Sequence, residues 1–276
     1  MTPPGGNVQS CRFGRRFSVR GNGMMDVSRR GFFQRASGAT VISICAIAAP
    51  VVLGQRPQKV SQDELTEAIV NHCAWLGNQG KGTRAVFNNR DLSGLNFTSA
   101  DGSMVNLHGA DFTGSDMTGV TGKDVSFLRA SLHDARLSWS HFELVTFSNA
   151  SLRRSECDNV VWGWDAASQN SPSPVDPANA SGFQYTDAGH ADFSRAKIRG
   201  FFHETSFTAA KLIEADFSYS HFRGNGFSQT SFHGANLSSA KFNFANLSHV
   251  NFSSAICTQT DFSNSEVGYR ARLAKA

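Results

Sequence analysis

The sequence predicts an all-β protein, in which short parallel strands coil around one apolar core. The main observation is a large apolar residue at every fifth position of two long runs, and 22 of these 28 positions hold Phe or Leu. Neither the helix period of about 3.6 residues nor the strand period of about two produces such a recurrence. The composition agrees, because 23 phenylalanines stand beside four tryptophans and three tyrosines, and only 17% of the residues are charged.

Residues 1–55 are expected to be an export signal with a preface. Five residues of the stretch SRRGFFQ resemble the twin-arginine signal S-R-R-x-F-L-K: Ser28, Arg29, Arg30, Phe32 and Phe33. The apolar run 36–53 that follows is weaker than the roughly 20 strongly apolar residues of a membrane span. The resemblance implies twin-arginine export of the folded protein to the periplasm, with membrane contact only through this signal. An uncleaved anchor in the inner membrane is the alternative.

Residues 56–88 are expected to form a linker and a helix that caps the first coil. Ser61 precedes Glu64 by three residues, which is the spacing of a capping box at a helix N-terminus. Three apolar side chains of this helix are expected to face the coil: Leu65, Ile69 and Trp75. A cap is needed because the end of a solenoid exposes unpaired backbone and interior apolar groups.

Residues 89–265 carry the repeat. In many units the large apolar residue follows Asp or Asn, which itself follows a small residue, as in Ala110-Asp111-Phe112 and Ala235-Asn236-Leu237. This pattern resembles the A-(D/N)-L-x-x signature of the pentapeptide-repeat family. Four units make a square coil of about 20 residues, and such coils stack through parallel hydrogen bonds. The resemblance implies a right-handed quadrilateral parallel β-helix, and the units present give about eight coils.

The large residue and the small residue of each unit are expected to face a narrow interior. Neighbouring coils must close this core above and below, because one coil alone cannot bury its apolar residues. Expected core residues include Phe112, Leu132, Phe142, Phe217, Phe232, Leu237 and Phe252.

A break at about 163–182 separates the two runs, Leu92–Trp162 and Phe202–Phe262, each of which keeps its register. Three prolines in this break cannot donate ladder hydrogen bonds, so we expect a loop that bulges from one face. Its candidate interaction residues are Trp162, Trp164, Asp165, Pro174 and Asp176. Between this break and the second run, three residues fit the five-residue spacing as inward residues: Phe183, Phe193 and Ile198. The fit requires that one residue is missing from the repeat just before Phe202.

Residues 266–276 form a short tail, in which Tyr269 and Leu273 are large apolar residues. Such a tail covers the end of a solenoid less well than the N-terminal helix does. We therefore expect this end to be open to a partner, including a second copy in an end-to-end homodimer.

Residue types that often carry chemistry occupy solvated positions of the repeat. Exposed carboxylates interleaved with Asn lack the burial that raises the pKa of a catalytic acid: Asp91, Asp101, Asp111, Asp116, Asp192, Asp216 and Asp261. No histidines recur at the 20-residue spacing that a metal site between coils would need. Cys157 and Cys257 lie about four coils apart, beyond disulfide reach. The sequence predicts no catalytic residue, metal or cofactor, and thus no enzyme.

The net charge of +4 belongs to the N-terminus. Seven of 26 basic and one of 22 acidic residues precede Pro50, which leaves 19 basic against 21 acidic residues. No nucleic-acid partner is therefore expected. Residues 89–266 carry 18 acidic and 12 basic residues.

The first functional hypothesis is an exported, non-catalytic scaffold that binds an unidentified protein or envelope component. The second follows from the family resemblance: some relatives are acidic DNA mimics that bind DNA gyrase, and this applies if the export signal is not used. A polysaccharide-cleaving β-helix enzyme, the third hypothesis, is disfavoured because the one loop lacks clustered acidic or basic residues.

Overall fold

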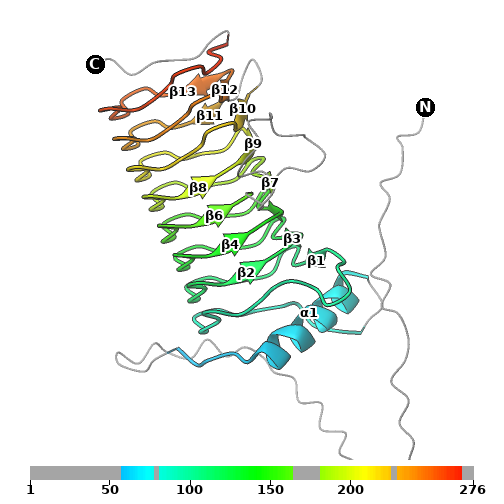
Figure 1. Cartoon of the computed structure of the whole chain (residues 1–276). Coiled ribbons are helices and arrows are strands. Elements are labelled where there is room, and N and C mark those ends of the chain that lie inside the picture. The colour runs from blue at the N-terminus through cyan, green and yellow to red at the C-terminus, as the bar shows by residue number, and fades with distance from the viewer. Residues whose placement is uncertain (1–56, 78–80, 164–180, 225–228, 269–276) are drawn as a thin grey trace, which may run out of the picture. The chain divides into compact units, whose positions relative to one another are not determined.

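Parallel backbone pairing between successive coils organises the chain (Figure 1). The computed structural model describes residues 57–77, 81–163, 181–224 and 229–268, which belong to one unit spanning Gln55–Ala276. The predicted fold, a parallel β-solenoid with one short helix, is confirmed. Within these ranges, no helix has the length and apolar character needed to cross a membrane.

The strands are short because each side of a coil contributes only about five residues. The helix is α1 (Gln62–Leu76). One sheet contains, in spatial order, β1 (Val105–Asn106), β3 (Val125–Ser126), β5 (Val145–Thr146), β7 (Ser181–Gly182), β9 (Gly200–His203), β10 (His221–Arg223) and β12 (Asn246–Leu247). A second contains β2 (Thr121–Gly122), β4 (His141–Phe142), β6 (Val161–Trp162) and β8 (Lys197–Ile198), and a third β11 (Thr230–Ser231) and β13 (Val250–Asn251).

Four rows of paired residues define the sides of the coil, numbered here in chain order. Side 1 runs through Val86, Asp111, Ser131, Ser151, Asp187, Ser206, Ser231 and Asn251. Side 2 runs through Asp91, Asp116, Arg136, Glu156, Asp192, Lys211, Asn236 and Ile256. Side 3 carries the four-stranded sheet, and side 4 carries the seven-stranded sheet.

The residue after each paired position points inward, so the core is a column of Phe and Leu. At most 1% of each of the following residues is exposed: Phe112, Leu132, Phe142, Phe217, Phe232, Leu237 and Phe252. The ring of Phe232 stacks on Phe207 and Phe252 of the adjacent coils, with centroids 5.0 and 5.2 Å away. It meets Phe242 edge-on. Each such pair adds about 0.5–1.5 kcal/mol to the stabilisation from burial.

Most sides end in a β-turn that starts at the inward residue. In these turns the residue two positions later has a left-handed backbone, with φ of 56° at Asn89 and 58° at Asp134. The next N–H bonds back to the inward residue, as from Ser115 to the Phe112 carbonyl at 3.0 Å. This is the pattern of a type II turn. Gly163 has a further constraint, because a Cβ there would lie 2.0 Å from the Arg199 carbonyl oxygen.

Coil length varies, and this corrects the predicted register. Many paired residues are 20 positions apart, but Asp91 pairs with Asp116, 25 positions later, because the first coil holds five additional residues before β1. Gly102, predicted to face the core, is exposed in this insertion. The 25-residue step recurs over Ser206–Ser231. Phe227, predicted to face inward within that step, lies outside the described residues.

The break between the two runs also appears in the pairing. Ser151 pairs with Asp187, 36 positions later, so this coil holds 16 residues more than a coil of 20. Asp187 then pairs with Ser206, only 19 positions later, which is the one-residue deletion that the sequence predicts. Three inward residues after the break are buried: Phe183, Phe193 and Ile198.

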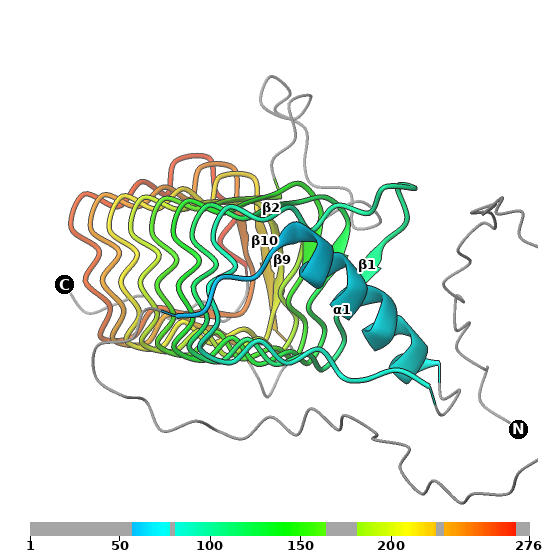
Figure 2. The same ribbon diagram turned by 90° about the horizontal axis from the view of Figure 1, so that it is seen from below.

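Helix α1 lies against the first coil beside β1 (Figure 2). Ser61 is its N-cap, and the Ser61 hydroxyl accepts a hydrogen bond from the Glu64 N–H at 3.1 Å. Leu65 is fully buried, and Ile69 packs against the core. Trp75, predicted to face the coil, is instead 44% exposed, because its ring stacks on the outer side of a buried histidine.

That histidine, His72, fastens the helix to the first coil. It is fully buried, its Nδ1 accepts from the Ala85 N–H at 3.1 Å, and its Nε2 donates to the His108 carbonyl at 3.1 Å. Only a neutral ring with its proton on Nε2 makes both bonds. Burial lowers the pKa of His72 and favours this neutral form.

Candidate interaction surface

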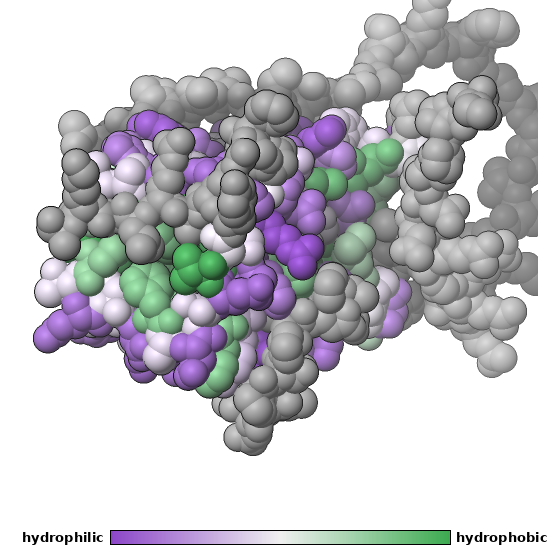
Figure 3. Space-filling model, turned by 90° about the horizontal axis from the view of Figure 1, so that it is seen from above, coloured by the Kyte–Doolittle hydropathy of each residue, from purple (hydrophilic) through white to green (hydrophobic). Residues whose placement is uncertain are grey.

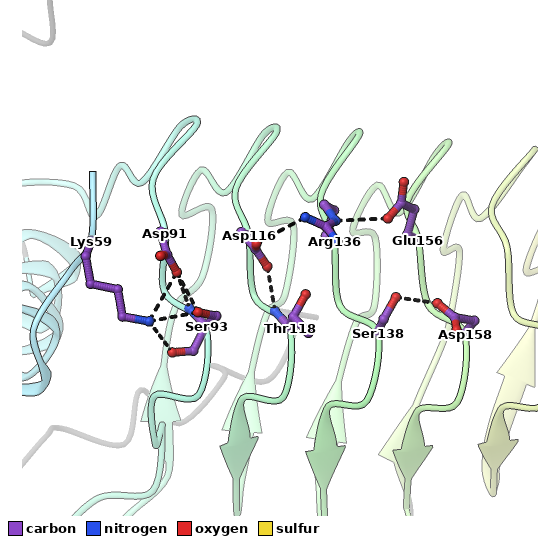
Figure 4. A network of polar contacts seen from close by, with 9 residues as sticks. All are labelled: Lys59, Asp91, Ser93, Asp116, Thr118, Arg136, Ser138, Glu156 and Asp158. Carbon is purple, nitrogen blue, oxygen red and sulfur yellow. Dashed lines mark hydrogen bonds and ion pairs between the residues drawn. The ribbon is translucent and has the colours of Figure 1, made fainter. Parts of the chain in front are cut away.

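Side 2 carries a row of charged side chains that pair from coil to coil (Figure 4). Lys59 Nζ lies 3.2 Å from Asp91 Oδ1 at the start of this row. Arg136 bridges two carboxylates, at 3.2 Å from Asp116 Oδ2 and 3.0 Å from Glu156 Oε2. These groups are partly or largely exposed, so each pair contributes at most about 1 kcal/mol. The row stabilises the stacking of coils and leaves little unpaired charge on this side.

The carboxylates and amides of the repeat bond to their own turns. Asp111 Oδ1 accepts from the Thr113 N–H at 3.1 Å and from the Thr113 hydroxyl at 2.7 Å. The N–H two residues later donates in the same way to Asp91, Asn96, Asp101, Asn106, Asp116, Asp187, Asp192, Asp216, Asn236, Asn246, Asn251 and Asp261. Hydrogen bonds from Ser103 and Ser99 lower the pKa of Asp101 to about 2. A general acid at neutral pH needs the opposite shift.

Metal and thiol chemistry find no support in the part of the chain that the structure describes. No three His, Cys, Asp or Glu side chains gather there closely enough to hold a metal ion. Cys157 lies in the core beside the Ser155 hydroxyl, and burial raises the pKa of its thiol. Burial also raises the pKa of Cys257. A reactive cysteine needs a lowered pKa and access to solvent.

The structure places Trp162 in the core and not on a surface loop. Its side chain is fully buried at the end of β6, and its indole N–H donates to the Ser140 hydroxyl at 2.9 Å. The prediction that Trp162 contributes to an interaction loop is therefore wrong, because β6, which carries Trp162, pairs with β4 and β8 within the solenoid. The other predicted loop residues lie outside the described residues, as do the five of the export signal: Trp164, Asp165, Pro174 and Asp176, and Ser28, Arg29, Arg30, Phe32 and Phe33.

Large aromatic side chains occupy the left-handed turn position of several coils. Trp139 is 65% exposed and Phe244 is 51% exposed, with φ of 64° and 56°. Tyr185 and Tyr219 occupy the same position, with φ of 54° and 63°. The core does not need these rings, since other coils hold Gly or Asn there. The spacing of the repeat could have identified these residues, because each follows its inward residue by two positions.

The C-terminal coil is less well covered than the coils before it. Phe262 and Cys257, its inward residues, are only partly buried, whereas Phe242 and Phe252 are buried. Ile256 and Val267 are exposed at this end. Figure 3 views the coils from above and shows apolar side chains among hydrophilic ones. This end and the exposed turn aromatics are thus the two candidate interaction surfaces.

A comparison with family models finds eight copies of the model described as pentapeptide repeats. They cover residues 83–119, 130–160, 202–238 and 230–266. A comparison with curated proteins finds no match.

Several solved structures resemble the chain at low identity. HetL from the cyanobacterium Nostoc sp. strain PCC 7120, a pentapeptide-repeat protein involved in heterocyst differentiation regulation, is 17% identical, with 72% of this chain and 92% of HetL covered and a TM-score of 0.30. QnrB1, a plasmid-mediated fluoroquinolone resistance protein, is 15% identical, with 67% and 92% covered and a TM-score of 0.29. A pentapeptide-repeat protein of the Arabidopsis thaliana thylakoid lumen is 18% identical, with 54% and 79% covered and a TM-score of 0.28.

Likeness at this level says nothing about function. The repeats that the family model matches nevertheless lie on both sides of the break at about 163–182, and their residues form paired coils of the described solenoid. The chain therefore belongs to the pentapeptide-repeat family.

Proposed function

We propose that this protein is an exported, non-catalytic scaffold that presents a surface of its solenoid to a protein or another component of the cell envelope. One observation carries the proposal: polar side chains of the repeat bond to turns and neighbouring coils, while large rings project into solvent at Trp139, Tyr185 and Phe244. Exposed aromatic side chains are enriched where proteins bind one another.

Export is supported by the sequence SRRGFFQ at residues 28–34 and the apolar run after it. Twin-arginine signals, which this segment resembles, direct folded proteins out of the cytoplasm. The proposed location is the periplasm, with an inner-membrane anchor as the alternative if the signal is not cleaved.

DNA mimicry is the alternative function if the signal is not used. A mimic of duplex DNA needs a continuous negative surface. On side 2 the acidic groups alternate with basic ones, such as Arg136 between Asp116 and Glu156 and Lys211 beside Asp192. The scaffold is therefore favoured over the mimic.

The last described coil, whose inward residues Cys257 and Phe262 are only partly buried, offers a route to self-association. An end-to-end homodimer would cover Ile256 and Val267, which are exposed in the single chain. Sedimentation analysis decides this part of the proposal. A dimer that dissociates in the Ile256→Asp variant supports the end-to-end homodimer. A protein that stays monomeric at all accessible concentrations refutes it.

Cell fractionation tests the proposed export. A C-terminally tagged chain and its Arg29→Lys, Arg30→Lys variant are expressed, and the N-terminus of the recovered protein is sequenced. A periplasmic product that starts near Ala49 and is lost in the variant supports the proposal. A full-length cytoplasmic protein would overturn export and make DNA mimicry the leading hypothesis.

A further inference from the structure

A column of stacked side chains lies at the turns that end side 3, in three successive coils. The guanidinium carbon of Arg199 lies over the ring of Tyr219, 5.5 Å from its centroid. The Tyr219 ring stacks in turn on Phe244, with centroids 5.0 Å apart and planes within 2° of parallel. Phe244 is largely exposed at the end of this column.

A second column lies on side 4, where β9 pairs with β10. Phe201 and His221 are paired residues, and their rings stack with centroids 4.9 Å apart. The guanidinium of Arg223 lies over the ring of Phe201, 6.0 Å from the ring centroid. The two columns together form the aromatic–cationic patch: Arg199, Phe201, Tyr219, His221, Arg223 and Phe244. Arg199 is buried, Phe201, Tyr219 and His221 are partly buried, and Arg223 and Phe244 are the exposed members.

The two columns are neighbours along the chain. They use residues two positions apart in the same coils, since Arg199 precedes Phe201 and Tyr219 precedes His221. Arg223 and Arg199 both lie close enough to His221 to act on its charge, and Glu266 is the acidic group that faces it. Glu266 is itself held by the side-chain amide of Asn246 at 2.8 Å.

The fold does not explain the rings of this patch. Tyr219 and Phe244 have left-handed backbones, a conformation that disfavours bulky residues. Earlier coils hold Ser126 and Thr146 at the side 4 position taken by Phe201 and His221. Small polar residues therefore suffice for stacking at these positions, and the rings add apolar surface outside the core.

The charge of the patch indicates which partner it fits. Arg223 is exposed and, among the described residues, has no carboxylate partner, whereas Arg136 and Arg154 each have one. A guanidinium that lies over a ring can still donate its N–H groups to a carboxylate. Stacked arginine and exposed aromatic side chains are also the residue types that dominate binding energy between proteins.

We propose that the aromatic–cationic patch docks an acidic peptide segment of a partner protein. A carboxylate of the segment pairs with Arg223, and an aromatic side chain of the segment packs against Phe244. This inference rests on the proposed scaffold function, for which it names the surface and the chemistry of the partner.

Fluorescence anisotropy with a labelled random copolymer of glutamate and tyrosine tests the proposal on the purified full chain. We expect saturable binding that weakens by about fivefold or more in Arg223→Gln and in Phe244→Ser. Binding should also weaken as salt is added. Thermal melting of each variant verifies that the solenoid is intact, because both side chains lie outside the core.

Matched controls come from the same chain. Arg129 is an exposed arginine at a side 4 turn of an earlier coil, and Trp139 is an exposed ring at a side 2 turn. Arg129→Gln and Trp139→Ser should bind the copolymer like the unmodified protein. Equally weakened binding in the two control variants would mean that any exposed arginine or aromatic ring contributes to nonspecific binding of the copolymer. That result would overturn the proposal.

Two other probes separate this partner from other classes. Single-stranded oligothymidylate and vesicles of phosphatidylglycerol are titrated in the same way. Binding of either one through Arg223 and Phe244, without binding of the copolymer, would overturn the peptide proposal. The titration does not depend on export, so a cytoplasmic location would refute only the proposed export, and a failed titration would refute only the proposed partner.

Discussion

The backbone N–H of Ala85 donates a hydrogen bond to Nδ1 of the buried His72, and this bond joins the first coil to the helix that caps it. A proton on Nδ1 would remove the acceptor and place a charge in the core near Arg84 and His108. The docking of the cap therefore depends on the protonation of one ring.

We expect the free energy of unfolding to fall as the pH drops below about 6.5. Burial lowers the pKa of His72 in the folded protein, so the unfolded chain binds the proton first and is favoured. The stabilisation that the neutral His72 ring provides is fully present above the pKa of His72 in the unfolded chain. It is lost as the pH falls towards the lower pKa of His72 in the folded protein. Urea unfolding between neutral pH and about pH 5, above the range of the carboxylates, measures it.

Burial and the nearby Arg223 also lower the pKa of His221. Variants are therefore needed to show that the pH dependence of stability comes from His72. His72→Gln should cost about 1–2 kcal/mol at neutral pH and flatten part of the pH dependence. His190→Gln, at an exposed position, should leave it unchanged. An unaltered slope in His72→Gln would contradict the role of the helix contact.

Phe217→Asp should destabilise the solenoid by more than about 4 kcal/mol, because it buries a carboxylate without a partner. Phe217 is fully buried among the rings of Phe202, Phe207 and Phe232. Phe217→Leu keeps an apolar side chain and should cost far less, and Phe244→Asp at the surface should be close to neutral. An unchanged melting temperature for Phe217→Asp would refute the inward assignment.

Trp162→Ala should cost about 3–5 kcal/mol, as expected for a large cavity in a core. Trp162→Phe should cost less, because it removes chiefly the bond to the Ser140 hydroxyl. Chemical denaturation of the three proteins gives both values. Trp164→Ala carries a different prediction, namely nearly unchanged stability and weaker partner binding.

Gly163→Ala should destabilise the protein more than Gly119→Ala. Both glycines have left-handed backbones, with φ of 76° and 67°, so each variant carries a conformational cost of about 1–2 kcal/mol. A Cβ at Gly163 also collides with the Arg199 carbonyl, whereas a Cβ at Gly119 meets no atom within 4 Å. Equal melting temperatures for the two variants would show that the backbone near Arg199 yields without cost.

Arg136→Gln should lower the free energy of unfolding by less than about 1 kcal/mol, although it removes two ion pairs. The side chain is more than half exposed, so water and salt screen it. The difference from the unmodified protein should disappear in high salt. A larger loss that persists there would mean that the row on side 2 acts as a network.

The five-residue period suffices to predict the coil and most of its inward residues, because every unit must solve the same packing problem. It failed at Gly102, since an insertion of five residues preserves the register and leaves no trace in the period. Trp162 was assigned both to the inward row and to the loop, and only the pairing of β6 places it in the core. The aromatic–cationic patch was missed because Arg199 and Tyr219 are 20 positions apart and meet only when coils stack.

The rows of sides 1 and 2 join each coil only to the coil before it and the coil after it. A mechanical pull on the two ends of the stack would therefore load the hydrogen bonds of one coil at a time, and not all of them together in shear. The solenoid should therefore unfold at low force, one coil after another. The less covered coil that holds Ile256 should unfold before the first coil, which α1 caps.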